Sequence, residues 1–129
     1  TEQPRTFLFV SKYPVRVAKF LSEDSIVTAS DDAQVRILSL QGRLTQAWNA
    51  HDDYIRSIVV QYPFLITSGD DMLIKVWDME YNFACIHTLV GHDHYVMQVK
   101  VNPRDPSMLA SASLDRTVKL WKLPEINQP

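Results

Sequence analysis

The sequence lacks the cysteines that an internal disulfide needs, because Cys85 is its single cysteine. It also contains no run of about 18 apolar residues and no apolar core of a signal peptide. These absences argue against a disulfide-rich secreted domain and against a helix that spans a membrane. We therefore expect a reducing, cytoplasmic setting.

The sequence also lacks an excess of positive charge. Its 13 Lys and Arg residues are matched by 15 Asp and Glu residues, which gives a formal net charge of −2. Nonspecific binding of nucleic acid depends on a basic field around the protein. We therefore expect no nucleic acid among the partners.

What the sequence does contain is one pattern that occurs three times. In each copy Thr or Ser lies four residues before an Asp, and a large apolar residue lies six residues after that Asp. The three aspartates, Asp32, Asp71 and Asp115, are 39 and 44 residues apart, which is typical of a four-stranded propeller blade. The pattern predicts an all-β protein built from repeated blades.

Short segments of alternating apolar and polar residues, bounded by turn residues, predict strands, and no window favours a helix. The expected strands are 5–10, 15–20, 25–30, 34–39, 44–49, 55–60, 64–68, 73–78, 84–89, 96–101, 108–112 and 117–122. The segment 102–107 has two prolines and no apolar side chain, so it is expected to form a loop between two strands of the last blade.

Three repeats are too few to close a propeller, which normally has about four to eight blades. We therefore expect a partial β-propeller whose unpaired strand edges are covered by further blades, from the same chain or from another copy. The expected division is an outer strand of a preceding blade at 1–12, full repeats at 13–50 and 51–90, a partial repeat at 91–123 and a tail at 124–129.

Two of the three copies carry further features of a known repeat. Ala50-His51 and Gly91-His92 lie upstream of the second and third aspartates, and Trp77-Asp78 ends the second copy. These features resemble the WD40 repeat. In WD40 blades the Asp holds the His, the His reaches a hydroxyl group, and the hydroxyl group reaches an indole N–H. The resemblance implies two such tetrads, which are His51, Thr67, Asp71 and Trp77, and His92, Ser111, Asp115 and Trp121.

The first copy departs from this pattern. It keeps Thr28 and Asp32, but Leu38 replaces the tryptophan, and Lys12 or Tyr13 lies where the Gly-His pair is expected. We expect this blade to be packed by apolar side chains, without a tetrad.

The tetrad residues permit two other interpretations. A set of Ser, His and Asp is also typical of hydrolases, but here the hydroxyl group is expected to face an indole, and no Gly-x-Ser-x-Gly elbow is present. His92 and His94, with Cys85 upstream, have the side chains of a zinc site, but the tetrad already uses His92. We therefore expect no enzymatic activity, no metal and no cofactor.

The turns that lead into the innermost strands of a propeller face one rim of its central channel and have little role in packing. The predicted rim residues are Arg16, Asp31, Asp53, Tyr54, Arg56, Asp70, His94 and Tyr95. Guanidinium, carboxylate and aromatic groups together suit a peptide that carries both signs of charge. Solvated rim charges that bind nothing are the open alternative.

Longer strings of the sequence resemble the N-terminal propeller of the coatomer beta-prime family. They include 13–16, 51–58, 68–78, 91–97, 102–107 and 110–121, and the resemblance extends over 13–123. It implies that the chain corresponds to the second to fourth blades of a seven-bladed ring.

The resemblance also implies a function. Members of this family are non-enzymatic vesicle-coat subunits on the cytosolic face of Golgi membranes and coated vesicles. They bind C-terminal dilysine signals of membrane cargo for retrieval to the endoplasmic reticulum, and their partners include the other coatomer subunits. The alternative is a WD40 scaffold that holds coat or other subunits together without reading cargo.

Individual residues acquire roles through this resemblance. It implies that Arg16 contacts the terminal carboxylate of the peptide, and that Asp53 and Asp70 contact lysine ammonium groups, with Arg56 nearby on the same rim. The remaining contacts of the family lie on a blade that is not expected in this chain. We therefore expect the chain alone to bind such peptides weakly or not at all.

Overall fold

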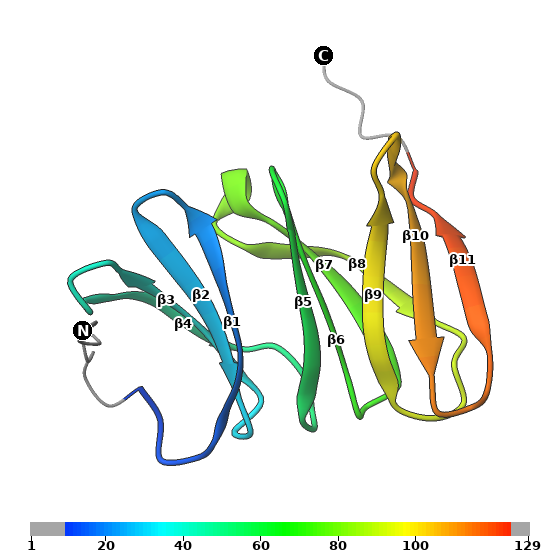
Figure 1. Ribbon diagram of the computed structural model, residues 1–129, viewed down its shortest axis with the longest axis horizontal. Helices are drawn as coiled ribbons and strands as arrows, with labels where there is room; N and C mark the ends of the chain where they lie inside the picture. The colour runs from blue at the N-terminus through cyan, green and yellow to red at the C-terminus, as the bar shows by residue number, and fades with distance from the viewer. Residues whose placement is uncertain (1–9, 125–129) are drawn as a thin grey trace, which may run out of the picture.

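The computed structural model describes residues 10–124, which form three antiparallel sheets (Figure 1). The first sheet has the order β1 (Val15–Ser22), β2 (Ser25–Ser30), β3 (Gln34–Ser39), β4 (Leu44–Asn49). The second has the order β5 (Ile55–Gln61), β6 (Phe64–Gly69), β7 (Leu73–Asp78), β8 (Ala84–Val90), with the 3-10 helix η1 (Met79–Tyr81) before β8. The third consists of β9 (Val96–Asn102), β10 (Asp105–Ser113) and β11 (Val118–Lys122). The prediction of an all-β, partial β-propeller is confirmed.

The first strands of the three sheets lie side by side. β5 contacts β1 on one side and β9 on the other, and each sheet extends away from this row (Figure 1). Sheets that radiate from a row of innermost strands are the blades of a propeller. The row β1, β5 and β9 is therefore the inner wall of the described part of the propeller.

Most predicted strands lie within two residues of the observed ones, and the predicted loop at 102–107 does connect two strands of the last blade, but it is shorter than predicted. β9 ends at Asn102 and β10 already begins at Asp105, which pairs with Asn102. The side chain of Asn102 accepts hydrogen bonds from the amides of Arg104 and Asp105, at 2.8 and 3.3 Å, and so closes a tight turn. The predicted strand at 5–10 lies outside the described residues except for Val10, as does the predicted tail beyond Pro124.

The turn after the second strand is built the same way in all three sheets. The residue after each repeat aspartate has a positive φ; these residues are Ala33, Met72 and Arg116. Each aspartate accepts a hydrogen bond from the amide two residues further on, at 2.9 to 3.2 Å. This is an Asx turn, and it explains why Asp recurs at this position.

The core lies between neighbouring sheets, in two clusters. Val27, Val35 and Ile37 of the first sheet pack against Ile55, Ile58 and Leu65 of the second. Ile66, Ile74 and Val76 of the second pack against Val96, Val99 and Leu109 of the third. Leu65 and Ile66 of β6 thus face opposite clusters, as alternation along a strand requires. The second sheet is therefore covered on both faces.

The innermost strands each carry a bulge at the same place. The pairs Val15↔Ser30, Ile55↔Gly69 and Val96↔Ser113 are each followed by a register shift. A bulge leaves one residue unpaired and redirects its side chain. The unpaired residues are Arg16, Arg56 and Met97.

We predict that Gly69→Ala destabilises the chain by about 1–3 kcal/mol, because overpacking against rigid atoms has costs of this size. A Cβ atom at Gly69 would meet the backbone carbonyl of Tyr54, which cannot move without disturbing β5. Gly91→Ala is the matched control, since its added methyl group would meet only side-chain atoms, the nearest at the ring edge of Trp121, and no backbone atom. Thermal unfolding of both variants, followed by circular dichroism, measures their changes in stability. Equal losses of stability would contradict the prediction that the Tyr54 carbonyl makes Gly69→Ala the more destabilising substitution.

Candidate functional site

The predicted tetrad of the second sheet is brought together. His51 Nδ1 donates to the carboxylate of Asp71 at 2.9 Å, so its Nε2 accepts from the hydroxyl group of Thr67 at 2.7 Å. The indole N–H of Trp77 donates to the same hydroxyl oxygen at 3.0 Å. His51 and Thr67 are buried, and every polar atom in this series has a partner. The tetrad is a structural element rather than a reactive one.

The tetrad of the third sheet has the same arrangement. His92 contacts Asp115 at 2.7 Å and Ser111 at 2.7 Å, and Trp121 donates to Ser111 at 2.8 Å. Asp115 also accepts from the hydroxyl group of Thr117 at 2.6 Å. Both hydroxyl groups that sequence analysis compared with hydrolase nucleophiles are therefore buried and held between an imidazole and an indole.

The tetrad carboxylates stay ionised at neutral pH. Burial alone raises the pKa of Asp71, but hydrogen bonds from His51 and from the amides of Asp52 and Leu73 outweigh it and lower the pKa below its usual value. The bond from the Asp52 amide, at 3.2 Å, also ties the loop before β5 to the turn between β6 and β7. The tetrad thus joins the two loops that carry the rim residues.

The first sheet has an apolar core and no tetrad, as predicted, but a polar network around Asp32, which was not predicted, takes the place of the tetrad. Arg36 Nη2 donates to Asp32 at 2.7 Å, and the hydroxyl groups of Ser30 and Ser11 donate to the same carboxylate. Burial raises the pKa of Asp32, but the bonds from Arg36 and Ser30 outweigh it and lower the pKa to about 2. Thr28, which keeps the position of the tetrad hydroxyl, has no hydrogen-bond partner within the described residues.

Sequence reasoning missed Arg36 and Ser11, although two signals were present. A basic residue lies four positions after each repeat aspartate, at Arg36, Lys75 and Lys119. Ser11 lies 21 residues before Asp32, close to the 20 residues that separate His51 from Asp71. Ser11 therefore occupies the place of the missing histidine.

Two rim arginines each form an ion pair with a rim aspartate. Arg16 donates through Nε and Nη2 to Asp31, both at 2.9 Å, and Arg56 donates through the same two nitrogens to Asp70, both at 2.7 Å. The aspartate side chains are 5% and 4% exposed, whereas those of Arg16 and Arg56 are 49% and 27% exposed. Hydrogen bonding to the aspartates raises the pKa of both arginines. The arginines therefore cover the carboxylates of Asp31 and Asp70.

Both rim arginines lie at the bulges of the innermost strands. The third sheet has the same bulge but no such ion pair, because Met97 and Leu114 replace the arginine and the aspartate. Met97 has the bulge position of Arg56, and Leu114 precedes Asp115 as Asp70 precedes Asp71. Among the described sheets, such arginine–aspartate pairs therefore occur on the rim of the first two only.

Tyrosine rings add a second constraint on Arg56. Its guanidinium carbon lies 5.6 Å from the centre of the Tyr54 ring and 5.8 Å from that of Tyr95. Both distances are within the range of cation–π attraction. The Tyr95 ring in turn makes an edge contact with His94, with 4.5 Å between ring centres. Arg56 is thus oriented by one carboxylate and two rings.

Asp53 differs from the other rim aspartates because it is exposed. It accepts a hydrogen bond from the amide of Tyr54 at 2.8 Å and forms no ion pair within the described part of the chain. A hollow of about 450 Å³ between the first two sheets is lined by Asp53, Tyr54 and Asp31, and by Tyr13 and Asn49. Three of the predicted rim residues therefore share one hollow.

Two kinds of feature are absent from residues 10–124. No group of three or more His, Cys, Asp and Glu side chains there is arranged to hold a metal ion. No helix in that range is long and apolar enough to cross a membrane. Cys85 is exposed, and its sulfur lies 3.6 Å from the hydroxyl oxygen of Thr88.

Comparison with known families gives a match over more than half of the chain. The family model of the WD domain, G-beta repeat, matches residues 42–78 and 83–122. The first match contains β4 to β7 and the second contains β8 to β11. Each match therefore takes the outermost strand of one sheet and the first three strands of the next.

Comparison with curated proteins gives similar sequences over a shorter stretch. Over 47 residues the chain is 57% identical to coatomer subunit beta'-2 of Arabidopsis thaliana. Over the same length it is 51% identical to coatomer subunit beta' of Homo sapiens and of Rattus norvegicus. The aligned stretch is 36% of this chain and 5% of each of these relatives. The chain therefore matches only a small part of their length.

We predict that Thr67→Val costs about 1–3 kcal/mol of stability, because the change leaves His51 Nε2 and the indole N–H of Trp77 buried without a partner. Thr88→Val is the control, since Thr88 is an exposed strand residue whose hydroxyl group has only the weak contact with the sulfur of Cys85. Urea unfolding of both variants measures the difference. A Thr67→Val variant as stable as the control would show that the tetrad contributes little.

Proposed function

The chain belongs to the WD40 repeat family, as its repeat pattern predicted, and on this premise we propose that its rim binds C-terminal dilysine signals of membrane cargo as part of a vesicle coat. Similarity to coatomer subunit beta' over 47 residues supports the coat assignment. On this proposal the protein acts at the cytosolic face of Golgi membranes and coated vesicles, and its partners include other coatomer subunits. We also propose that the chain divides into repeats at 13–50, 51–90 and 91–123.

The observation that carries the proposal is the pair of oriented arginines beside an exposed carboxylate. Arg16 and Arg56 each use Nε and Nη2 to bind an aspartate, so Nη1 of each is left for a ligand. The two are close enough that the charge of Arg56 opposes that of Arg16 and lowers the Arg16 pKa, although Asp31 outweighs this effect. A peptide carboxylate between them would relieve this repulsion.

The exposed carboxylate of Asp53 suits a lysine ammonium group of the same peptide. Asp70 suits this role less well, because both of its oxygens are bound by Arg56 and its side chain is buried. We therefore assign Asp53 as an ammonium contact and Asp70 as the residue that positions Arg56. Tyr54 borders both the Arg56 cluster and the hollow that contains Asp53, so it links the two halves of the proposed site.

The burial and hydrogen bonding of the two tetrad hydroxyl groups agree with a non-enzymatic role. Thr67 and Ser111 are buried, and each hydroxyl oxygen accepts a bond from a tryptophan N–H. A hydroxyl group in this position has no path to a substrate carbonyl.

We predict that a labelled peptide ending in Lys-Lys-Ala-Ala binds at least tenfold more tightly with a free C-terminus than with an amidated one. The expected change, about 1.4 kcal/mol, reflects the lost contacts between the carboxylate and the arginines. Because the resemblance places other contacts on a preceding blade, the titration uses a closed propeller in which this chain supplies three blades and a coatomer beta' relative supplies the rest. Equal affinity for the two peptides would overturn the carboxylate assignment.

Charge reversal at Asp53 provides the second arm of this experiment. Asp53→Lys is expected to weaken binding of the free peptide at least tenfold by repelling its lysines. Asp24→Lys, in the exposed turn between β1 and β2, is the matched control for the change in net charge. Unchanged peptide affinity in Asp53→Lys, together with intact assembly with coat subunits, would favour the scaffold function instead.

A further inference from the structure

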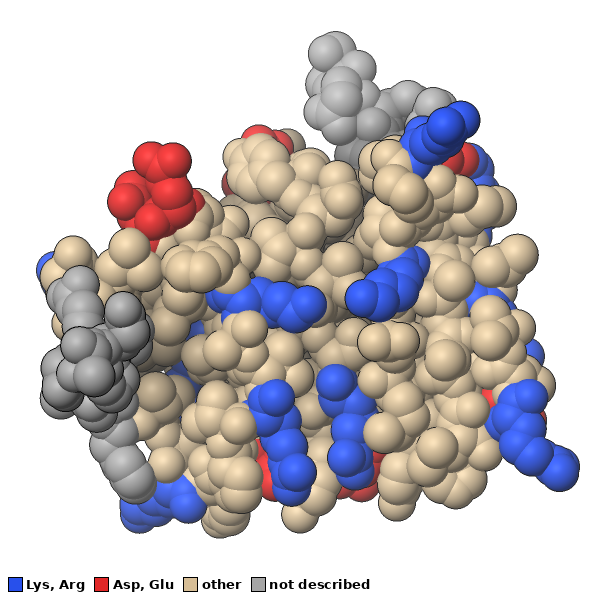
Figure 2. Space-filling view, in the orientation of Figure 1, with Lys and Arg blue, Asp and Glu red and all other residues tan. Residues whose placement is uncertain are grey.

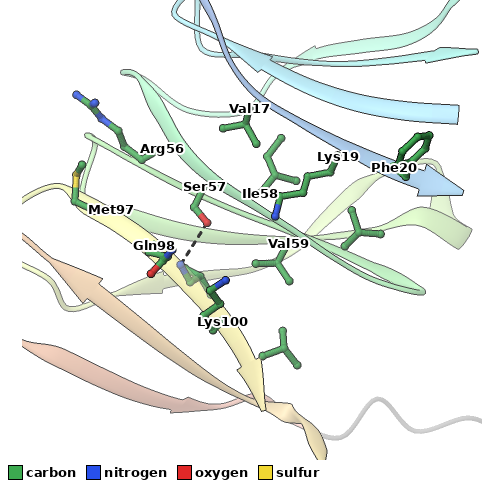
Figure 3. Close-up of a pocket in the computed structure, with 13 residues that line it drawn as sticks. Val17, Lys19, Phe20, Arg56, Ser57, Ile58, Val59, Met97, Gln98 and Lys100 are labelled. Atoms are coloured by element: carbon green, nitrogen blue, oxygen red, sulfur yellow. Dashed lines mark hydrogen bonds between the residues drawn. The ribbon is translucent and has the colours of Figure 1, made fainter. Parts of the chain in front are cut away.

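A second charged surface lies on the inner wall, below the rim. A groove of about 420 Å³ runs along β5 between β1 and β9 (Figure 3). Its polar lining residues are Lys19, Arg56, Ser57, Gln98 and Lys100. All charged residues that line it are basic. We call this surface the inner groove.

Lys19 and Lys100 are the uncompensated charges of the inner groove. Lys19 on β1 and Lys100 on β9 flank β5, and the side chains of both point into the space in front of it (Figure 3). Both residues are exposed, and neither forms an ion pair among residues 10–124. Arg56, by contrast, is neutralised by Asp70. The inner groove therefore carries about two net positive charges.

This local charge has the opposite sign to that of the whole chain, which has a formal net charge of −2. Figure 2 shows the same face, with Lys and Arg side chains gathered over its centre and lower edge and acidic side chains at its margins. The floor between the two lysines is largely apolar, with Ile58 and Val59 of β5. Low-dielectric walls of this kind focus the field of the charges that line them.

The shape of the inner groove favours an extended ligand. Residues 56–60 of β5 and 97–101 of β9 line it. Five residues of a strand span roughly 16 Å, the length of an extended peptide of about five residues. Gln98 adds an exposed amide, which can bond to the backbone of such a peptide.

We propose that the inner groove binds an acidic peptide segment in extended form, with its carboxylates on Lys19 and Lys100. The two ammonium groups supply the charge complementarity, and the apolar floor supports the peptide backbone. This site requires neither a terminal carboxylate nor a lysine in the ligand, so its ligand differs from that of the proposed dilysine site, which it adjoins at Arg56. All of its lining residues lie within the described part of the chain, so the test uses the 129-residue chain.

The test is a fluorescence-anisotropy titration of labelled, N-acetylated and C-terminally amidated pentaglutamate with the 129-residue chain at low salt. Saturable binding is expected, at least tenfold weaker in the double variant Lys19→Glu and Lys100→Glu. The matched control is Arg43→Glu with Arg104→Glu, two exposed turn residues outside the groove, which changes the net charge equally and is expected to bind nearly as the wild type. Equal weakening in both double variants would reduce the effect to overall charge and overturn the proposal.

A charge-removing double variant and a competing polyanion complete the test. Lys19→Gln with Lys100→Gln removes the charges without reversing them, and it is expected to weaken binding about threefold or more while leaving the circular dichroism melt unchanged. If inorganic triphosphate binds more tightly than pentaglutamate and displaces it, the site is one for a compact polyanion and the peptide proposal is wrong. Because the probe has no free C-terminus and no lysine, its failure leaves the rim assignment untouched.

Discussion

The hydrogen bond between His51 and Asp71 joins the two loops on which the rim depends. Asp53 and Tyr54 follow His51 in one loop, and Asp70 precedes Asp71 in the other. The backbone strengthens the same junction, since the amide of Asp70 donates to the carbonyl oxygen of Tyr54 at 2.8 Å. In the proposed binding site the tetrad acts indirectly, because it sets the positions of exposed residues while remaining buried itself.

The same backbone junction occurs in all three sheets, but the side chains on it differ. The amides of Asp31 and Leu114 donate to the carbonyl oxygens of Pro14 and Tyr95, at 2.9 and 3.0 Å, just as Asp70 does to Tyr54. On this shared frame two blades present an arginine and an aspartate, and one presents methionine and leucine. An asymmetric rim is what a peptide of mixed charge requires, since its carboxylate and its ammonium groups need different neighbours.

The sequence was sufficient for the strands and for the membership of the tetrads, because both depend on regular spacing. It was insufficient for the pairing of Arg56 with Asp70, which depends on a bulge that alternation does not reveal. Both residues were placed on the rim as separate ligand contacts, whereas the aspartate lies beneath the arginine. Arg36 was missed although its spacing from Asp32 recurs at Lys75 and Lys119, because spacing alone does not show that the side chain of a strand residue binds the aspartate. The prolines of 102–107 predicted a longer loop, although Pro106 lies within β10, where the register is irregular.

Amide hydrogen exchange in an Asp71→Ala variant is the most direct test of the claim that the tetrad holds the rim in place. The amides of Asp52 and Asp70 are expected to exchange at least tenfold faster than in the wild type, because the Asp52 amide loses its acceptor and the Asp70 amide loses the fixed loop to which it bonds. The paired amides at the centre of β6, such as that of Ile66, are predicted to keep their protection. Unchanged protection at Asp52 and Asp70 would contradict the account, as would uniform loss of protection across the sheet.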